Sequence, residues 1–265
     1  MEALSGISAL LPVVIRAFDG IQVARAFEGD LKLHQISLDI VQLRLSRWAA
    51  AVGLGHDPAK GDAEKEVLEA AKAKFASPGE IETAEELVNN IKKVLRDAQE
   101  ASKKMQHQEA LDEETNTEDD LAPRFKRLHQ KLRALTHKRL HHASIRYEGT
   151  KWSLYKKDQA EALVTKLLDL IEQLEQLVEP AGPQLDELTQ DDCRYVGESA
   201  RALLEVLGDS DPRLRAAATE SLKGEEATYS VSVKTGTNYG MVVGVNNKEI
   251  KGISFGSGGT VNNHW

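Results

Sequence analysis

Apolar residues recur at the spacing of an α-helix through most of the first 226 residues. The clearest run predicts a helix from about Lys157 to Glu179, which Pro180 and Gly182 then end. A second run follows a capping box of Thr83 and Glu86 and predicts a helix to about Met105. The apolar stripe of the first run has a 4,3,4,3 spacing and consists of Val164, Leu167, Ile171, Leu174 and Val178.

The segment Leu33–Ala51 carries two apolar stripes, which predicts a central helix buried around most of its circumference. The stripes are Ile36, Ile40 and Leu43, and Leu38, Val41, Leu45 and Trp48. Shorter helices are predicted over 62–76, 123–140, 184–207 and 212–222, and short strands only at Ser144–Tyr147 and Thr150–Leu154. We therefore expect an all-α helical bundle of about 7–9 helices, with room for one short two-stranded element near 144–154. Trp48 and Trp152 should be core anchors of this bundle.

Composition changes sharply near residue 226, which predicts a helical domain over 1–226 and a separate tail over 227–265. The tail holds 7 of the 19 glycines, four charged residues and no proline. The whole chain has a net charge of −8, which argues against nucleic acid as a partner. Its one cysteine, Cys193, excludes an intramolecular disulfide and fits a reducing, intracellular compartment. We expect this thiol to be buried or inert.

The segment 121–147 is basic and contains no acidic residue. An acidic stretch, 112–120, lies directly before it. The segment is either a surface for anionic lipid headgroups or a solvated helix face partly neutralised by the acidic stretch, and the pattern favours the second. Its basic residues are Arg124, Lys126, Arg127, Lys131, Arg133, Lys138, Arg139 and Arg146.

No motif for catalysis or cofactor binding stands out in the chain. A P-loop, a G-x-G-x-x-G after a strand, an H-E-x-x-H and a G-x-S-x-G are all absent. His137, His141 and His142 have helical spacing, but without neighbouring carboxylates or cysteines they are more typical of surface histidines than of a metal site. We expect no enzymatic activity, no cofactor and no metal.

The N-terminal segment, taken as 1–28, begins with the longest uncharged apolar run, residues 3–15. This run is too short to cross a bilayer of about 30 Å, and Glu2 stands where a signal peptide would be basic. Three interpretations remain open: a core helix, a helix that leaves the domain and inserts, or an interfacial anchor. The candidate membrane-inserting residues are Leu4, Ile7, Leu10, Leu11, Val13, Val14 and Ile15.

Three stretches carry a resemblance to a known family: Phe18–Asp30, Gln35–Trp48 and Lys151–Tyr155. They resemble the HeLo domain of the fungal HET-s/HET-S heterokaryon-incompatibility family, and the similarity spans roughly residues 1–225. The resemblance implies an all-helical domain with a small two-stranded hairpin. It also implies a toxic form that releases its N-terminal segment into membrane under the control of an amyloid-forming tail. The matching residues within the second stretch are Gln35, Leu38, Asp39, Ile40, Arg44, Leu45, Ser46, Arg47 and Trp48.

The tail repeats the pattern G-x-x-aromatic-G-x-x-x-x-V-N-N with a period of 16. Because 16 is even, equivalent residues keep the same strand face, as stacked cross-β layers require. Residues 238–246 also form a pseudo-palindrome that looks like the RHIM-like amyloid signalling motifs. The predicted amyloid core is Gly236, Asn238, Tyr239, Gly240, Met241, Val242, Val243, Gly244, Val245 and Asn246 with Gly252, Phe255, Gly256, Val261 and Asn262. The alternative is a flexible Gly/Asn-rich tail, but the β-branched and aromatic content favours assembly.

These patterns together give one main functional hypothesis and one alternative. The main one is a cell-death executor, cytoplasmic at rest, whose N-terminal helix disrupts membranes once its disordered tail is templated into amyloid. Its partners would be other copies of itself, a receptor with a matching amyloid motif, and membrane lipid. The alternative is a non-toxic helical adaptor or prion-like scaffold whose tail polymerises without membrane insertion.

Overall fold

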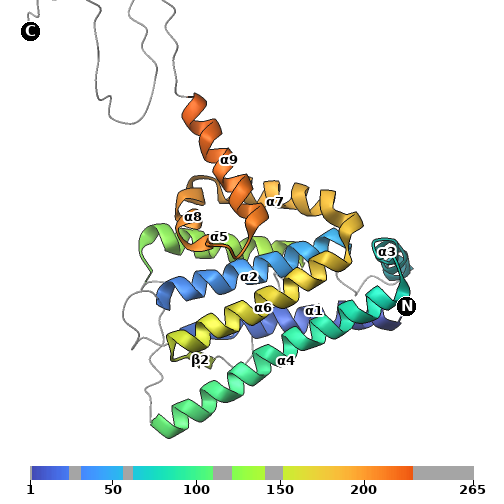
Figure 1. Ribbon diagram of the computed structural model, residues 1–265, viewed down its shortest axis with the longest axis horizontal. Coiled ribbons are helices and arrows are strands. Elements are labelled where there is room, and N and C mark those ends of the chain that lie inside the picture. The colour runs from blue at the N-terminus through green and yellow to red at the C-terminus, as the bar shows by residue number, and fades with distance from the viewer. Residues whose placement is uncertain (1, 24–30, 56–61, 110–120, 141–151, 229–265) are drawn as a thin grey trace, which may run out of the picture. The chain divides into compact units, whose positions relative to one another are not determined.

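The computed structural model describes residues 2–23, 31–55, 62–109, 121–140 and 152–228 (Figure 1). The chain divides into two units, Met1–Ala227 and Thr228–Trp265, and the first holds the packed helices. The predicted amyloid repeat lies outside the described residues, as do the acidic stretch 112–120 and the expected strand at Ser144–Tyr147.

The described part of the chain is almost entirely helical, which confirms the predicted all-α class. The α-helices are α1 (Glu2–Asp19), α2 (Leu31–Ala51), α3 (Asp62–Lys72), α4 (Pro78–Glu109), α5 (Pro123–Arg139), α6 (Lys157–Leu177), α7 (Gly182–Val196), α8 (Ala200–Leu207) and α9 (Pro212–Thr228). Two 3-10 turns, η2 (Glu179–Ala181) and η3 (Gly197–Ser199), and two strands, β1 (Ile21–Val23) and β2 (Trp152–Leu154), complete the set.

Helix α2 is the central element, as its two apolar stripes predicted. One stripe, which includes Leu38 and Trp48, joins a hydrophobic cluster with side chains of α1, α3, α4 and α6. The other, which includes Ile36 and Leu43, joins a second cluster with side chains of α5, α7, α8 and α9. Helix α2 therefore contributes side chains to both cores of the domain, as does α7, and it lies between its neighbours in Figure 1.

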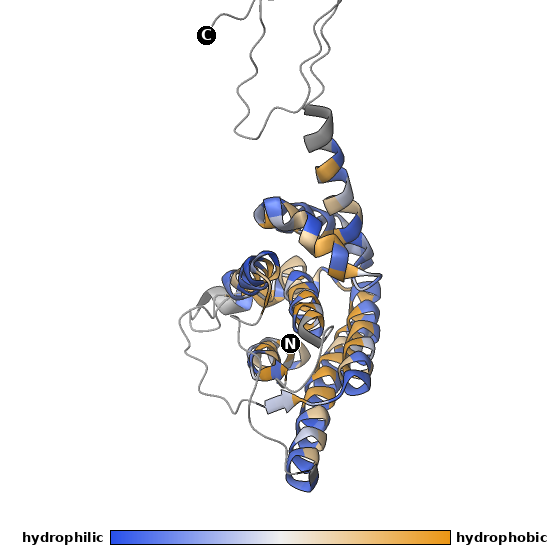
Figure 2. Ribbon diagram, turned by 90° about the vertical axis from the view of Figure 1, so that its left-hand side faces the viewer, coloured by the Kyte–Doolittle hydropathy of each residue, from blue (hydrophilic) through white to orange (hydrophobic). Residues whose placement is uncertain are grey.

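Helix α1 packs mainly along α4, and α4 packs in turn on α6. Helix α4 continues past these partners, and its last turns are hydrophilic (Figure 2). Both predicted tryptophan anchors are confirmed as buried. Trp48 also donates a hydrogen bond from Nε1 to the carbonyl oxygen of Leu174 at 2.9 Å, which joins α2 to α6.

The small sheet differs from the expected hairpin. The predicted strand near 150–154 exists as β2, but its partner is β1, in parallel, with Ile21 opposite Trp152 and Val23 opposite Leu154. Two parallel strands need a long connection along the chain, and here helices α2 to α5 lie between β1 and β2 in the sequence. A three-residue strand is too short to show alternation, so β1 left no periodic signal in the sequence.

Several helix boundaries also differ from prediction: α3 ends at Lys72 instead of residue 76, and α9 continues to Thr228 instead of residue 222. Two further differences have a local cause. Helix α4 starts before the proposed Thr83 cap: the N–H of Glu80 donates to Ser77 Oγ at 3.3 Å, and the N–H of Ala76 donates to the Glu80 carboxylate at 2.8 Å. The predicted helix 184–207 is divided into α7 and α8. The division falls at Gly197, whose φ of +51° interrupts the helix in a region that favours glycine.

Candidate functional site

The N-terminal helix α1 forms part of the domain core. Five of its seven candidate membrane-inserting residues are buried: Leu4, Ile7, Leu11, Val14 and Ile15. Leu10 is half-buried, and Val13 is 41% exposed. Of the three interpretations of this segment, the structure shows the core helix, with its apolar residues covered by α4 and by neighbouring helices. No described helix has the length and apolarity needed to cross a membrane.

The end of α1 is fixed by a polar cluster around Asp19. Gln42 on α2 donates its amide to Asp19 Oδ1 at 3.1 Å and to the carbonyl oxygen of Ile15 at 3.3 Å. Arg133 on α5 pairs with the same carboxylate at 3.0 Å, and His137 lies 3.4 Å from it. Burial alone would raise the pKa of Asp19, but hydrogen bonds from His137 and Gln42 and the charge of Arg133 lower it.

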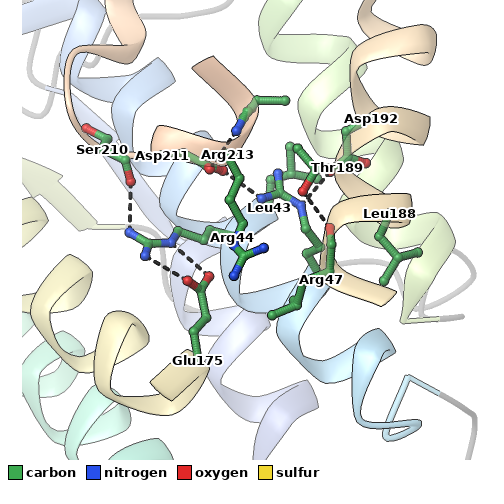
Figure 3. A network of polar contacts seen from close by, with 12 residues as sticks. Leu43, Arg44, Arg47, Glu175, Leu188, Thr189, Asp192, Ser210, Asp211 and Arg213 are labelled. Atoms are coloured by element: carbon green, nitrogen blue, oxygen red, sulfur yellow. Dashed lines mark hydrogen bonds and ion pairs between the residues drawn. The ribbon is translucent and has the colours of Figure 1, made fainter. Parts of the chain in front are cut away.

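A fully buried ionic cluster lies on the other side of α2, centred on Arg47 (Figure 3). Its Nε donates to Asp192 on α7 at 2.9 Å, and its Nη1 donates to Asp211, just before α9, at 2.8 Å. Asp192 also pairs with Arg139 of α5. Burial alone would lower the pKa of Arg47, but the charges of Asp211 and Asp192 raise it above its ordinary value.

Arg44, one turn before Arg47, makes the second set of contacts in this region. Its guanidinium forms a two-pronged pair with Glu175 of α6, at 2.9 and 2.8 Å. Its Nη1 donates to the carbonyl oxygen of Ser210 at 3.0 Å. Asp211 in turn caps α9, because its Oδ1 accepts the N–H of Leu214 at 3.0 Å. Arg44 and Arg47 together therefore bind the turn that begins α9 (Figure 3).

A further buried pair connects α2 with α5. His129 Nδ1 lies 2.5 Å from Asp39 Oδ2, and both side chains are 4% exposed. Burial raises the pKa of Asp39, and the hydrogen bond and charge of His129 offset that effect only in part. With the Asp19 and Arg47 clusters, this pair places charged or polar contacts along much of α2.

The basic segment is largely occupied with contacts inside the domain. Arg133 binds the partly buried Asp19, and Arg139 binds the buried Asp192. Arg124 pairs with Glu205 at 2.9 Å, and Lys131 donates to the carbonyl oxygen of Val196 at 2.8 Å. These contacts use charges that a lipid-binding surface would need free, so they support the interpretation of the segment as a structural helix face. Arg146 lies outside the described residues.

The remaining candidates for chemistry are one cysteine and three histidines. Cys193 is buried on α7, as predicted. His137 faces Asp19, whereas His141 and His142 lie outside the described residues. Among the residues that the structure describes, no three His, Cys, Asp or Glu side chains are placed to hold a metal ion.

Sequence reasoning missed the roles of Arg44, Arg47, Asp192 and Asp211. A signal was present: α2 was predicted to be buried around most of its circumference, yet it contains charged residues. A buried charge must be paired, so Arg44 and Arg47 required acidic partners from elsewhere in the chain. Their identity could not be read from the sequence, because the partners lie more than a hundred residues away.

The arrangement defines a class of protein: an all-helical domain that buries an apolar N-terminal helix and carries a compositionally distinct C-terminal tail. The family model HeLo, described as prion-inhibition and propagation, matches residues 3–206. The chain therefore belongs to the HeLo family. This confirms the resemblance of the helical domain to HET-s/HET-S proteins.

Two curated relatives come from Podospora anserina. Heterokaryon incompatibility protein S is 26% identical over 221 residues, covering 82% of this chain and 70% of that protein. Heterokaryon incompatibility protein s is 27% identical over 171 residues, covering 64% of this chain and 55% of that protein.

Two solved structures share the fold of the helical domain. A double mutant of the HET-s N-terminal domain superposes with a TM-score of 0.69 at 24% identity, covering 82% of this chain and 98% of that one. The HET-s N-terminal domain itself gives a TM-score of 0.64 at 23% identity, covering 83% and 98%.

Proposed function

We propose that this protein is a cell-death effector of the heterokaryon-incompatibility type, in which α1 disrupts membranes after the tail is templated into amyloid. The observation that carries the proposal is α1 itself, a helix with no charge over residues 3–15 at the start of a HeLo domain. The names of the relatives, heterokaryon incompatibility proteins S and s, support the same role. The proposal includes no enzymatic step.

Release of α1 needs a strong driving force because its apolar side chains are well buried. Exposing a Leu, Ile or Val side chain costs about 1.5–3 kcal/mol. Burial of the five candidate side chains therefore stabilises the packed position of α1 by about 10 kcal/mol. Assembly of the tail is the proposed source of that force. Cross-β stacking would bring successive tails to a spacing of about 4.7–4.8 Å, far less than the width of a helical domain. Crowded domains must then rearrange.

The proposed action on the membrane is collective. Helix α1 has 18 residues, which span about 27 Å, and it contains Pro12 and Arg16. A single α1 is therefore too short to cross a bilayer of about 30 Å unaided, and the joint insertion of many copies held together by one fibril would supply the disruption. The proposed partners are other copies of the chain, a receptor with a matching amyloid motif and membrane lipid. The protein would move from the cytoplasm to the cell membrane on activation.

The decisive experiment uses Val13→Asp in the full-length protein. Because Val13 is exposed, an acidic side chain fits there in the folded domain. In a membrane, the same side chain costs about 2.5–3.5 kcal/mol at a central position. We expect the variant to melt at the wild-type temperature and still be seeded by fibrils of 227–265. Its release of dye from phosphatidylserine-containing liposomes should nevertheless fall strongly.

The matched control is Asn90→Asp, which adds an acidic charge at an exposed position on α4. It should leave leakage at the wild-type level. A folded Val13→Asp protein that leaks as well as the wild type would overturn the role of α1. In that case another part of the chain would disrupt the membrane. The scaffold alternative, which the deep burial of α1 in the resting domain favours, would be supported by seeded wild-type protein that forms fibrils and releases no dye.

A further inference from the structure

We propose that Arg44 and Arg47, with Ser210 and Asp211, form a joint that couples α9 to the packing of α1. We call these four residues the arginine joint. Its regulatory meaning rests on the proposed function, since α9 is the helix from which the chain continues into the tail. The coupling itself is a property of the resting domain and is testable without membranes or fibrils.

The joint is the charged part of the anchor that holds α9. Asp211 is 2% exposed, binds Arg47 at 2.8 Å with one oxygen and caps α9 with the other. The carbonyl oxygen of the preceding residue, Ser210, accepts from Arg44 at 3.0 Å. The start of α9 is thus bound to α2 through both a side chain and the backbone (Figure 3).

Among the described side chains of α9, the buried apolar residues lie close to the joint, and Leu222 further along is only partly buried against the second hydrophobic cluster. Leu214 and Ala218 are buried in the second hydrophobic cluster, whereas none of residues 219–223 is buried. From Asp211 to Thr228 the helix extends about 26 Å at 1.5 Å per residue. A pulling force applied at the tail is therefore transmitted to the joint along α9.

The same stretch of α2 also holds α1. Gln42, two residues before Arg44, binds the last turn of α1 through Ile15 and Asp19. Leu45 and Trp48, which flank Arg47, belong to the cluster that buries α1. A shift of α2 at the joint thus reaches the side chains that hold α1 within one helical turn.

Loss of Asp211 would disturb this stretch because Arg47 has no route to water. Its side chain is 0% exposed, and its other carboxylate, Asp192, is shared with Arg139. A buried guanidinium deprived of half its counter-charge destabilises the helix that carries it. Pulling α9 away from the joint and neutralising Asp211 should therefore loosen α2 and α1 in the same way.

The test is Asp211→Asn in the full-length, unseeded protein, followed by hydrogen exchange and mass spectrometry. Asparagine keeps the cap on α9 but removes the charge that faces Arg47. We expect amides of α9 and of α1 to exchange about tenfold faster than in the wild type, measured relative to α6. The matched control is Asp209→Asn, which removes the same charge two residues away at a side chain that is 99% exposed. It should leave both helices unchanged.

Faster exchange in α9 alone would overturn the coupling, because Asp211 would then be a local anchor only. Equal acceleration of every helix, α6 included, would overturn it as well, because the substitution would then act by general destabilisation. If Asp211→Asn does not fold, Arg44→Lys replaces it: lysine keeps a positive charge beside Glu175 but lacks the fork that also reaches Ser210. Arg44→Lys must then accelerate the hydrogen exchange of amides in both α9 and α1 for the proposal to stand.

A parallel leakage assay separates this inference from the proposed function. Wild-type protein that is seeded but does not leak liposomes would refute the membrane role, while coupled exchange of α9 and α1 would still support the joint. Wild-type protein that leaks, together with an Asp211→Asn variant in which α1 is unaffected, would refute the joint and leave the membrane role intact.

Discussion

The charged side chains of α2 connect parts of the domain that are far apart in sequence. Asp39, Arg44 and Arg47 are buried, and each contacts a partner at least ninety residues away. Burying such pairs costs desolvation energy that their mutual attraction returns only when the geometry is good, so they add little net stability. Their value is specificity: a shifted α2 would leave several buried charges unpaired at once.

Trp48 is the apolar counterpart of these contacts on the same helix. Replacing it with alanine should lower the free energy of unfolding by about 3–5 kcal/mol, because a large buried side chain is lost. The carbonyl oxygen of Leu174 would also lose its donor. Urea denaturation of the full-length protein measures the effect. Tyr195→Ala, at an aromatic residue that is 46% exposed, is the control, and equal midpoints for the two variants would contradict the anchor role.

Asp19 gives the domain a predictable response to acid. Its pKa in the folded state is lowered below the ordinary value of 3.8, so below about pH 5 the unfolded chain binds the proton more readily than the folded one. The stabilisation it contributes is therefore present above pH 3.8 and is lost as the pH falls through its folded-state pKa.

We expect Asp19→Asn to be less stable than the wild type at neutral pH and to lose less stability on acidification from about pH 5 to pH 3. Urea midpoints at several pH values in this window measure both effects. Asp97→Asn, at an exposed position on α4, controls for the removal of one acidic charge. A wild-type pH slope in Asp19→Asn would show that the contacts of this carboxylate with Gln42 and Arg133 do not favour its charged form.

At the scale of the element, the turns around α8 depend on two glycines with positive φ. Gly208 has φ +49° and ψ −135°, and it leads directly into Ser210 and Asp211. A β-carbon there meets no atom within 4 Å, so steric crowding from neighbours plays no part. Any destabilisation on substitution must come from the backbone conformation itself, which side-chain-bearing residues rarely adopt.

Gly208→Ala should therefore destabilise the domain by about 1–3 kcal/mol, while Gly182→Ala serves as the matched control. Gly182 also has open space around its Cβ position, but its φ of −48° is helical, so alanine should be neutral or slightly stabilising there. Thermal melts of the two variants make the comparison. Equal melting temperatures would mean that the turn relaxes without strain.

The sequence predicted the helices well where they are long and amphipathic and less well where tertiary contacts decide. The two apolar stripes of α2 correctly predicted a central helix, because each apolar face needs other helices to cover it. The division of 184–207 escaped prediction, since a glycine inside an apolar pattern is compatible with a continuous helix until its φ is known. Strand β1 escaped because it is three residues long and is fixed by pairing with distant Trp152–Leu154.

At the scale of the whole molecule, the chain combines two kinds of order. The helical domain folds to one structure through its buried hydrophobic clusters and paired charges. The composition of the tail instead favours order only through assembly with other copies. Helix α9 is continuous with the tail in sequence, so any force from assembly must enter the domain at this helix. The membrane role and the regulatory meaning of the arginine joint both depend on the tail forming a stacked structure.

The amyloid repeat of the tail can be tested on the tail alone. Residues 227–265 should fibrillise alone and seed the full-length protein, because the period of 16 keeps equivalent residues on the same strand face. Val243→Pro should abolish seeding, since proline removes a hydrogen-bond donor from the centre of the predicted core. Thioflavin T kinetics and electron microscopy measure the effect. Ser230→Pro, placed before the repeat, should seed normally, and unchanged seeding by Val243→Pro would exclude 236–246 as the core.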